Sequence, residues 1–242
     1  MSTAFSLQGQ RILITGAASG IGAAAARICA SLGADVALLD LAGCEAVAAT
    51  IVADGGVARS FSADVADRVA IERIVAGLGR VDGLVASAAL CPWEDWLDPG
   101  WDDSFARVMD VNLLGPIHCA RALLPGMIER RHGRIVLVGS LAGRMGGLIA
   151  GPHYVASKGG LHALVKWLAK KGGPHNVLVN GVAPASVETA MMRGQPVDLS
   201  RIPLGRMAAP DEVAWPIAFL CSAAASYICG TVVDVNGGVY MN

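Results

Sequence analysis

Short runs of β-branched and other apolar residues alternate along the chain with longer segments of helical character, and this alternation constrains the fold most. The runs typical of strands are residues 11–15, 35–39, 57–62, 82–87, 134–139, 177–182 and 231–235. Several of them contain three or four consecutive apolar residues instead of alternating with polar residues. Such runs indicate parallel strands that are covered on both faces of a sheet.

Helical segments lie between these strands, at residues 21–32, 44–53, 69–78, 101–130, 154–171 and 211–222. Parallel strands joined by helices need right-handed crossovers, which place helices on both faces of the sheet. No repeat, low-complexity tract or linker interrupts residues 1–242. The sequence therefore predicts an α/β fold in a single domain, with a doubly wound sheet of about seven parallel strands.

Glycine and proline mark the expected ends of the helices. Gly33 and Gly133 each follow a helical run, at a position where a left-handed residue commonly ends a helix. Pro210 precedes two acidic residues and predicts the start of the last helix. Pro116 and Pro125 fall inside the segment 101–130, so we expect a kink or a join within it.

Composition and charge exclude several classes of protein. Of 242 residues, 54% are hydrophobic and 16% are charged, and the net charge is −1, which argues against a disordered or nucleic-acid-binding chain. No apolar run approaches the roughly 20 residues that span a bilayer. The first ten residues lack a secretory signal, so we expect a cytoplasmic protein with reduced thiols. The cysteine and histidine spacings match no metal site, and we expect none.

A glycine-rich turn follows the first predicted strand. It reads Thr15-Gly16-Ala17-Ala18-Ser19-Gly20-Ile21-Gly22 and runs into an alanine-rich helix. Glycines let the backbone turn sharply and approach a pyrophosphate, whose charge is favoured at the N-terminus of a helix. This context predicts a Rossmann-type dinucleotide site that includes Gly16, Ser19, Gly20, Ile21 and Gly22. A tight turn without a ligand is the alternative.

Asp40 ends the second predicted strand, 18 residues after Gly22. A carboxylate there can accept hydrogen bonds from both hydroxyls of the adenosine ribose and would repel a 2′-phosphate. The neighbouring Leu41 offers no positive charge, so NAD is favoured over NADP. Alternatively, Asp40 caps the next helix. Asp64 and Val65, after the third strand, are further candidates for a contact with the adenine.

Tyr154 and Lys158 are four residues apart in a predicted helix, so the ammonium group lies beside the phenol. A tyrosine with an ordinary pKa near 10 is a poor base at neutral pH. Lowering that pKa by about three units requires roughly 4 kcal/mol of stabilisation of the phenolate. Lys158 and the positive nicotinamide ring of bound NAD can supply it together. Ser140, at the end of a predicted strand 14 residues upstream, adds to the pattern.

From Gln10 to Tyr240 the chain resembles the short-chain dehydrogenase/reductase family. The resemblance is carried by the T-G-x-x-x-G-x-G turn, by the order Asn112, Ser140, Tyr154 and Lys158, and by residues 180–184 and 234–238. It implies that Tyr154 exchanges a proton with the substrate, that Ser140 binds the substrate oxygen, and that Lys158 binds the nicotinamide ribose and lowers the pKa of Tyr154.

The same resemblance implies that Asn112 anchors a water for proton exchange with Lys158. It also implies cofactor contacts from Ala88, Pro184, Val187 and Thr189, and a homotetramer. Three departures stand out. Ala86-Ser87-Ala88-Ala89 replaces the family's Asn-Asn-Ala-Gly, Ala185 replaces a glycine after Pro184, and Gly139 replaces a serine before Ser140. We expect the change at Gly139 to be minor.

The substrate pocket is expected at the carboxyl ends of the strands, with walls from residues 91–96, 141–153 and 190–202. These segments offer a mainly apolar lining and a short covering segment at about 189–206, with candidate contacts from Trp93, Met145, Leu148 and Met191. Arg144 and Arg193 could bind a substrate anion or simply face solvent. His153 is interpreted either as a residue that supports the catalytic side chains from behind or as a packing residue.

These patterns predict an enzyme, an NAD-dependent dehydrogenase or reductase of a secondary alcohol or ketone. Three alternatives remain at this point. They are an NADP-dependent carbonyl or 3-oxoacyl reductase, a cofactor-independent dehalogenating lyase on the same fold, and a non-catalytic protein that senses the cofactor or serves as a scaffold.

Overall fold

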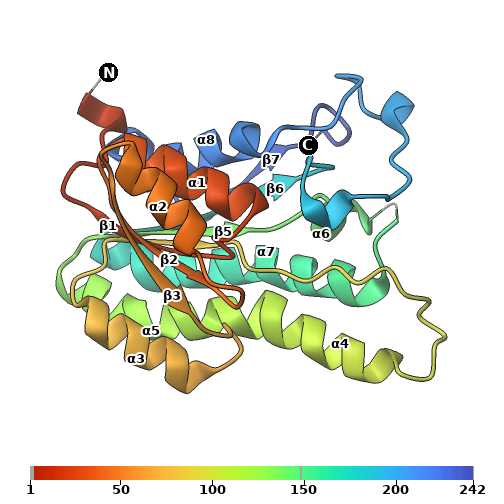
Figure 1. The fold of residues 1–242 in the computed structure, drawn as a ribbon, viewed down its shortest axis with the longest axis horizontal. Coiled ribbons are helices and arrows are strands. Elements are labelled where there is room, and N and C mark those ends of the chain that lie inside the picture. The colour runs from red at the N-terminus through yellow and green to blue at the C-terminus, as the bar shows by residue number, and fades with distance from the viewer. Residues whose placement is uncertain (1–2, 148, 242) are drawn as a thin grey trace.

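A computed structural model describes residues 3–147 and 149–241, in which one sheet forms the centre of the molecule. The sheet has seven parallel strands in the order β3-β2-β1-β4-β5-β6-β7, which confirms the predicted fold class (Figure 1). The strands are β1 (Arg11–Thr15), β2 (Asp35–Asp40), β3 (Val57–Ser62), β4 (Gly83–Ala86), β5 (Gly133–Val138), β6 (Val177–Pro184) and β7 (Val232–Val235).

Helices cover both faces of the sheet, as the crossover argument predicts. One face carries α1 (Gly20–Ser31), α2 (Glu45–Ala53) and α8 (Pro210–Cys221), and the other carries α3 (Arg68–Leu78), α5 (Gly115–Glu129) and α7 (Pro152–Gly172) (Figure 1). α4 (Trp101–Met109) leads into α5 below the sheet in this view, and the short α6 (Ala142–Met145) follows β5.

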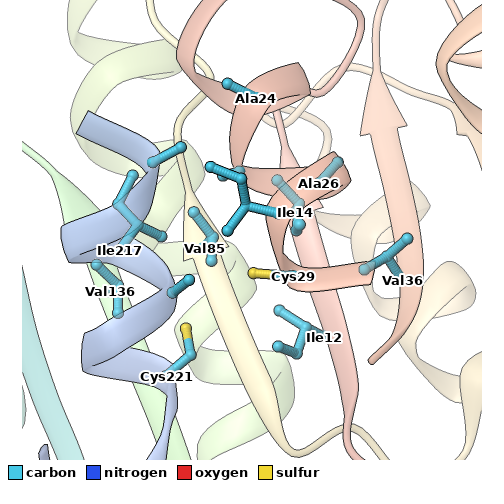
Figure 2. Close-up of a cluster of buried hydrophobic side chains, with 14 of the residues drawn as sticks. Ile12, Ile14, Ala24, Ala26, Cys29, Val36, Val85, Val136, Ile217 and Cys221 are labelled. Atoms are coloured by element: carbon cyan, nitrogen blue, oxygen red, sulfur yellow. The ribbon is translucent and has the colours of Figure 1, made fainter. Parts of the chain in front are cut away.

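The two layers of core come from the alternation of side chains along each strand. In β1, Ile12 and Ile14 are fully buried against α1 and α8, whereas Leu13 belongs to the core beneath α5 and α7. The small side chains of Ala24 and Ala26 on α1 are buried in this layer, so the helix packs closely against its neighbours (Figure 2). Burying an isoleucine in such a layer contributes about 1.5–3 kcal/mol.

The expected join in the long helical segment lies at Asp110–Leu114, a π-helical turn between α4 and α5. Pro116 has no N–H for the carbonyl of Asn112, and the Gly115 N–H bonds instead to the Asp110 carbonyl five residues back. The π turn that joins α4 to α5 is therefore centred on Asn112, near the carboxyl ends of the strands. Pro125 lies inside α5.

One of the two predicted left-handed caps is wrong. Gly33 has a φ of +97° after α1, as expected, but after α5 the left-handed residue is Arg131 with a φ of 50°. Gly133 is the first residue of β5, where a Cβ atom would lie 2.6 Å from the Met127 Sδ. Glycine is needed there for close packing and not for its backbone freedom.

Within residues 3–147 and 149–241, every helix is too short or too polar to cross a membrane. The same residues contain no cluster of three or more His, Cys, Asp or Glu side chains suited to a metal ion.

Candidate active site

The carboxyl ends of the parallel strands meet at one edge of the sheet, where β1 lies between β2 and β4 and the chain order reverses. A cavity of about 480 Å³ opens at this edge. Its lining includes every residue that the sequence predicts to bind the cofactor, namely Gly16, Ser19, Gly20, Ile21, Gly22, Asp40, Asp64, Val65, Ala88, Tyr154, Lys158, Pro184, Val187 and Thr189.

The glycine turn needs its glycines for two different reasons. Gly16 and Gly20 have φ values of +67° and +53°, which side-chain-bearing residues rarely adopt. A Cβ atom on Gly22 would overlap the Gly16 carbonyl oxygen, so the turn could not close as tightly. Ser19 is the N-cap residue of α1, but its side chain forms no capping hydrogen bond. The first N–H groups of the helix therefore remain available to an anion.

Asp40 reaches from the end of β2 toward this turn. One carboxylate oxygen accepts the Ala18 N–H at 3.1 Å, and the other accepts the Ala42 N–H at 3.1 Å. The alternative that Asp40 caps the next helix is wrong, because α2 begins at Glu45 with Cys44 as its N-cap. The half-buried carboxylate instead forms part of the cavity wall, with lone pairs left to accept further hydrogen bonds.

Asp64 is held by a residue that the sequence reasoning missed. Its Oδ2 forms an ion pair with Arg107 Nη2 at 2.7 Å, and its Oδ1 accepts the Ala66 N–H at 2.9 Å. Burial opposes ionisation, but the hydrogen bonds from Ala66 and Arg107 outweigh it and lower the pKa of Asp64. Arg107 comes from α4 and lines the cavity, and no sequence spacing relates it to Asp64.

At two of the departures from the family pattern, nearby hydrogen bonds hold the backbone without the family's usual residue. The Thr15 hydroxyl oxygen accepts the N–H groups of Ser87 and Ala88, both at 3.2 Å, and so joins β1 to the segment after β4 without an asparagine side chain. Ala185 donates its N–H to the Val235 carbonyl at 3.2 Å with an ordinary negative φ, so a glycine is not required there.

We expected from the sequence that the third departure, at Gly139, is minor. This expectation is wrong. A Cβ atom on Gly139 would overlap the Nε2 atom of His162, which comes from α7. Gly143 is restricted in the same way, since its Cβ would lie 2.9 Å from His162 Cε1. His162 therefore occupies space that a serine at position 139 would need.

Ser140, Tyr154 and Lys158 meet at one wall of the cavity, between the end of β5 and the first turns of α7. The hydroxyl groups of Ser140 and Tyr154 share a hydrogen bond. The Lys158 Nζ lies 5.6 Å from the centroid of the Tyr154 ring and donates to the Val138 carbonyl at 2.8 Å. This arrangement presents a phenol, a hydroxyl and an ammonium group to one small volume.

The protein groups alone favour the protonated phenol. Burial raises the pKa of Tyr154 to about 12, although the hydrogen bond with Ser140 acts in the opposite direction. Burial lowers the pKa of Lys158 to about 8, because an ammonium group is costly to bury. The expected lowering of the Tyr154 pKa by Lys158 is not among these effects, because Lys158, with the lower pKa, loses its charge before the phenol ionises.

Asn112 is buried beside the cavity but does not line it. Its Oδ1 accepts the Leu90 N–H at 2.7 Å, and its Nδ2 donates to the Leu90 carbonyl at 2.8 Å and to Ser157 Oγ at 3.1 Å. The side chain thus fixes the segment after β4 against α7. Because Pro116 has no N–H, the Asn112 carbonyl cannot accept the usual α-helical hydrogen bond, which makes it a candidate for the predicted contact with a water.

The substrate end of the cavity is lined by Trp93, Met145 and Met191, while the fourth predicted contact, Leu148, lies outside the described residues. Trp93 Nε1 donates to the Met191 carbonyl at 3.3 Å and so ties the segment after β4 to the covering segment. That segment consists of short 3₁₀ turns at Ala190–Met192 and Leu199–Arg201.

Neither predicted arginine lines this cavity. Arg144 forms an ion pair with Asp234 at 3.1 Å and donates to the Val232 carbonyl at 2.7 Å, and Arg193 lines a separate shallow hollow. The cavity contains Arg201 of the covering segment instead. Its position could not be inferred, because nothing in the sequence distinguishes it from an ordinary exposed arginine.

Comparisons with known proteins cover nearly the whole chain. The profile of the family described as Enoyl-(Acyl carrier protein) reductase matches residues 16–240. The chain is 36% identical over 248 residues to the L-rhamnose 1-dehydrogenase (NAD(P)(+)) of Azotobacter vinelandii, a match that covers 96% of each protein.

It is 37% identical over 249 residues to the 3-oxoacyl-(acyl-carrier-protein) reductase of Thermotoga maritima, which covers 96% of this chain and 98% of that relative. The solved structure of a 3-oxoacyl-(acyl-carrier protein) reductase from Brucella melitensis with bound NAD is similar, with a TM-score of 0.90 and 33% identity. This match covers 99% of this chain and 94% of the other.

Proposed function

Because the chain belongs to the short-chain dehydrogenase/reductase family of oxidoreductases, we propose that it transfers a hydride between NAD and a secondary alcohol or ketone. The observation that carries this proposal is the meeting of Ser140, Tyr154 and Lys158 at the wall of the cavity that the glycine turn opens.

The residues around the turn fit a dinucleotide. The uncapped start of α1 can bind a pyrophosphate, and the positive φ of Gly16 and Gly20 keeps side chains away from it. Asp40 can accept hydrogen bonds from the adenosine ribose, and Asp64 with Val65 borders the adenine end. When bound, the oxidised dinucleotide accepts the hydride and brings a positive ring.

Tyr154 exchanges the substrate proton in this proposal. With a pKa of about 12 the phenol is protonated at neutral pH, so it can donate to the oxygen of a ketone during reduction. In alcohol oxidation, nearby positive charge must lower that pKa before the phenolate can accept the proton. Ser140 holds the substrate oxygen through its hydroxyl group, and Lys158 supplies the positive charge next to the phenol.

Asp40 supports the choice of NAD. Its carboxylate would face the 2′-phosphate of NADP, and two unit charges about 4 Å apart repel by roughly 4 kcal/mol at an effective dielectric constant near 20. Such repulsion corresponds to a discrimination of several hundredfold before screening. Arg107, the nearest cavity arginine to the adenine end, is already paired with Asp64.

The cofactor preference can be tested by kcat/KM with NAD and NADP. We expect a wild-type preference for NAD, which Asp40→Ala should largely abolish. Asp54→Ala, an exposed aspartate that ends α2, serves as the matched control and should leave the ratio unchanged. A wild-type preference for NADP, or an unchanged ratio in Asp40→Ala, would contradict the assignment.

The lining of Trp93, Met145 and Met191 supports a largely apolar substrate. A panel of cyclohexanol, L-rhamnose and a 3-hydroxyacyl thioester, oxidised with NAD, would separate a simple alcohol from the substrate classes of the two relatives. We expect cyclohexanol to be oxidised with the highest kcat/KM. Failure to oxidise any secondary alcohol with either cofactor would contradict the proposed reaction.

We also propose a homotetramer, as the family resemblance implies. Light scattering on the purified protein is expected to give four times the chain mass of 24.8 kDa.

A further inference from the structure

The His153 side chain joins the catalytic helix to the segment after β4. Its imidazole is completely buried at the start of α7, directly before Tyr154. Nδ1 accepts the backbone N–H of Tyr154 at 2.9 Å, and Nε2 lies 3.2 Å from Oε1 of Glu94. One ring therefore bonds both to the backbone of the proposed proton-transfer residue and to a residue of the loop at 87–100, called here the substrate loop.

The hydrogen-bond pattern fixes the form of the ring. A backbone N–H only donates, so Nδ1 of His153 must be the unprotonated acceptor. In a neutral imidazole Nε2 then carries the hydrogen and donates it to the Glu94 carboxylate. Both ring nitrogens are used, each by a different segment of the chain.

The start of α7 has no other side-chain cap. The N-cap residue is Gly151, which has no polar side chain, and Pro152 has no N–H, so Tyr154 presents an early donor of the helix. The ring fits only because position 151 is a glycine, since a Cβ there would lie 2.7 Å from His153 Cε1. The His153 ring thereby fixes the backbone from which the Tyr154 side chain extends.

The substrate loop is fixed by the same ring at its midpoint. Cys91 and Trp93 of this loop line the cavity. Asn112 holds the loop at Leu90, and the ring of Trp101, where α4 begins, packs on His153 with centroids 5.6 Å apart. Between these two points, Glu94 provides the polar link to α7.

We propose that His153 is a positioning residue that couples the substrate loop, through Glu94, to the backbone of Tyr154. The proposal rests on the proposed function, because it assigns the loop to the substrate and Tyr154 to proton transfer. Through Nδ1 the ring sets the position of the phenol, and through Nε2 it sets the wall that the substrate contacts.

Two substitutions separate the two hydrogen bonds. In His153→Asn, the amide oxygen can take the place of Nδ1 and accept the Tyr154 N–H, but the shorter side chain no longer reaches Glu94. In His153→Gln, the amide nitrogen can take the place of Nε2 and donate to Glu94, while the acceptor for Tyr154 is lost. Activity is measured as the NAD-dependent oxidation of cyclohexanol.

We expect His153→Asn to raise KM about tenfold with kcat within about threefold of the wild type. We expect His153→Gln to lower kcat by about 10- to 100-fold with a smaller change in KM, because a displacement of about 1 Å at a reacting group has effects of this size. Equal effects of both substitutions on kcat and KM would overturn the proposal, since a purely structural residue gives no such split.

A third variant does not depend on the fully buried ring. Glu94→Ala changes a partly exposed side chain and removes only the link to the loop, and Glu129→Ala on α5 is the matched exposed control. Hydrogen–deuterium exchange, which needs no substrate, should speed up in the substrate loop of Glu94→Ala by at least about fivefold and stay unchanged in Glu129→Ala.

Identical exchange in the two alanine variants would overturn the coupling. A wild-type protein that oxidises no alcohol would contradict the proposed function alone, because the exchange experiment still measures whether Glu94 restrains the loop.

Discussion

The Nε2 atom of His162 accepts the backbone N–H of Ser140, with the two nitrogens 3.5 Å apart. His162 lies behind the cavity wall and does not line the cavity itself. Burial, together with the positive charges of Arg144 and Lys158, lowers the pKa of His162 to about 4. The ring is therefore neutral at pH 7, and Nε2 remains an acceptor that orients the loop carrying Ser140.

Gly139→Ala is expected to lower kcat/KM by about tenfold or more. The new methyl group would overlap the His162 ring, and such overpacking typically costs about 1–3 kcal/mol and shifts the loop. Thermal unfolding should show a lower Tm.

The matched test is a double-mutant cycle with His162→Val, which removes the ring that the methyl group meets. In that background, we expect Gly139→Ala to lower kcat/KM and Tm much less than it does in the wild type. Additive effects of the two substitutions would contradict a direct clash.

Tyr154→Phe is expected to lower kcat by about 10²–10⁴-fold, because the phenol is the group proposed to transfer the proton. The affinity for NAD, measured by calorimetry, should stay within about threefold, since the ring and the fold are retained. Tyr227→Phe is the control, because Tyr227 is fully exposed. A Tyr154→Phe enzyme with nearly full activity would remove Tyr154 from the mechanism.

The strands could be predicted because parallel strands buried on both faces contain consecutive apolar residues, as at 135–138 in β5 and 177–179 in β6. The cofactor end of the site could be predicted for a related reason. In a parallel sheet, the residues after β1, β2 and β3 must converge on one edge, so Gly16, Asp40 and Asp64 follow from the order of the strands.

Contacts between distant segments could not be predicted. Gly139 and His162 are on different elements, and the need for glycine appears only when α7 packs behind β5. Likewise, Arg107 reaches Asp64 only through the position of α4, and Arg144 is paired with Asp234 of β7. The position of the π turn at Asn112 could not be predicted either. The prolines indicate that two helices join within residues 101–130, but they do not indicate at which residue.

Lys158→Met is expected to change how stability depends on pH. The pKa of Lys158 is lowered from 10.5 to about 8 in the folded protein, so between these values the unfolded chain binds more protons than the folded one. The unfolding free energy of the wild type should therefore rise with pH across this window, by about 3 kcal/mol relative to Lys158→Met. Tyr154 acts in the opposite direction only above its ordinary pKa of 10.0.

Urea unfolding from about pH 7 to about pH 10 measures this difference. Below about pH 8 the curves for the two proteins should run parallel, because Lys158 is protonated in both the folded and the unfolded state. Parallel curves across the whole range would show that burial does not lower the pKa of Lys158.

Arg107→Gln is expected to weaken the binding of NAD by about three- to tenfold. Without Arg107, the Asp64 carboxylate faces the negatively charged dinucleotide uncompensated, and the cavity loses one positive charge. Both side chains of the pair are partly exposed, so the loss of stability should stay below about 1 kcal/mol. The weakening should diminish at about 1 M salt, because salt screens exposed charges. Calorimetric titration with NAD at low and high salt measures both effects.

Asp64→Asn in the Arg107→Gln background should restore much of the affinity, since it removes the uncompensated charge. Arg68→Gln is the control, because Arg68 pairs with Glu72 on α3 outside the cavity. If Arg107→Gln and Arg68→Gln bind NAD equally well, Arg107 has no part in holding the cofactor.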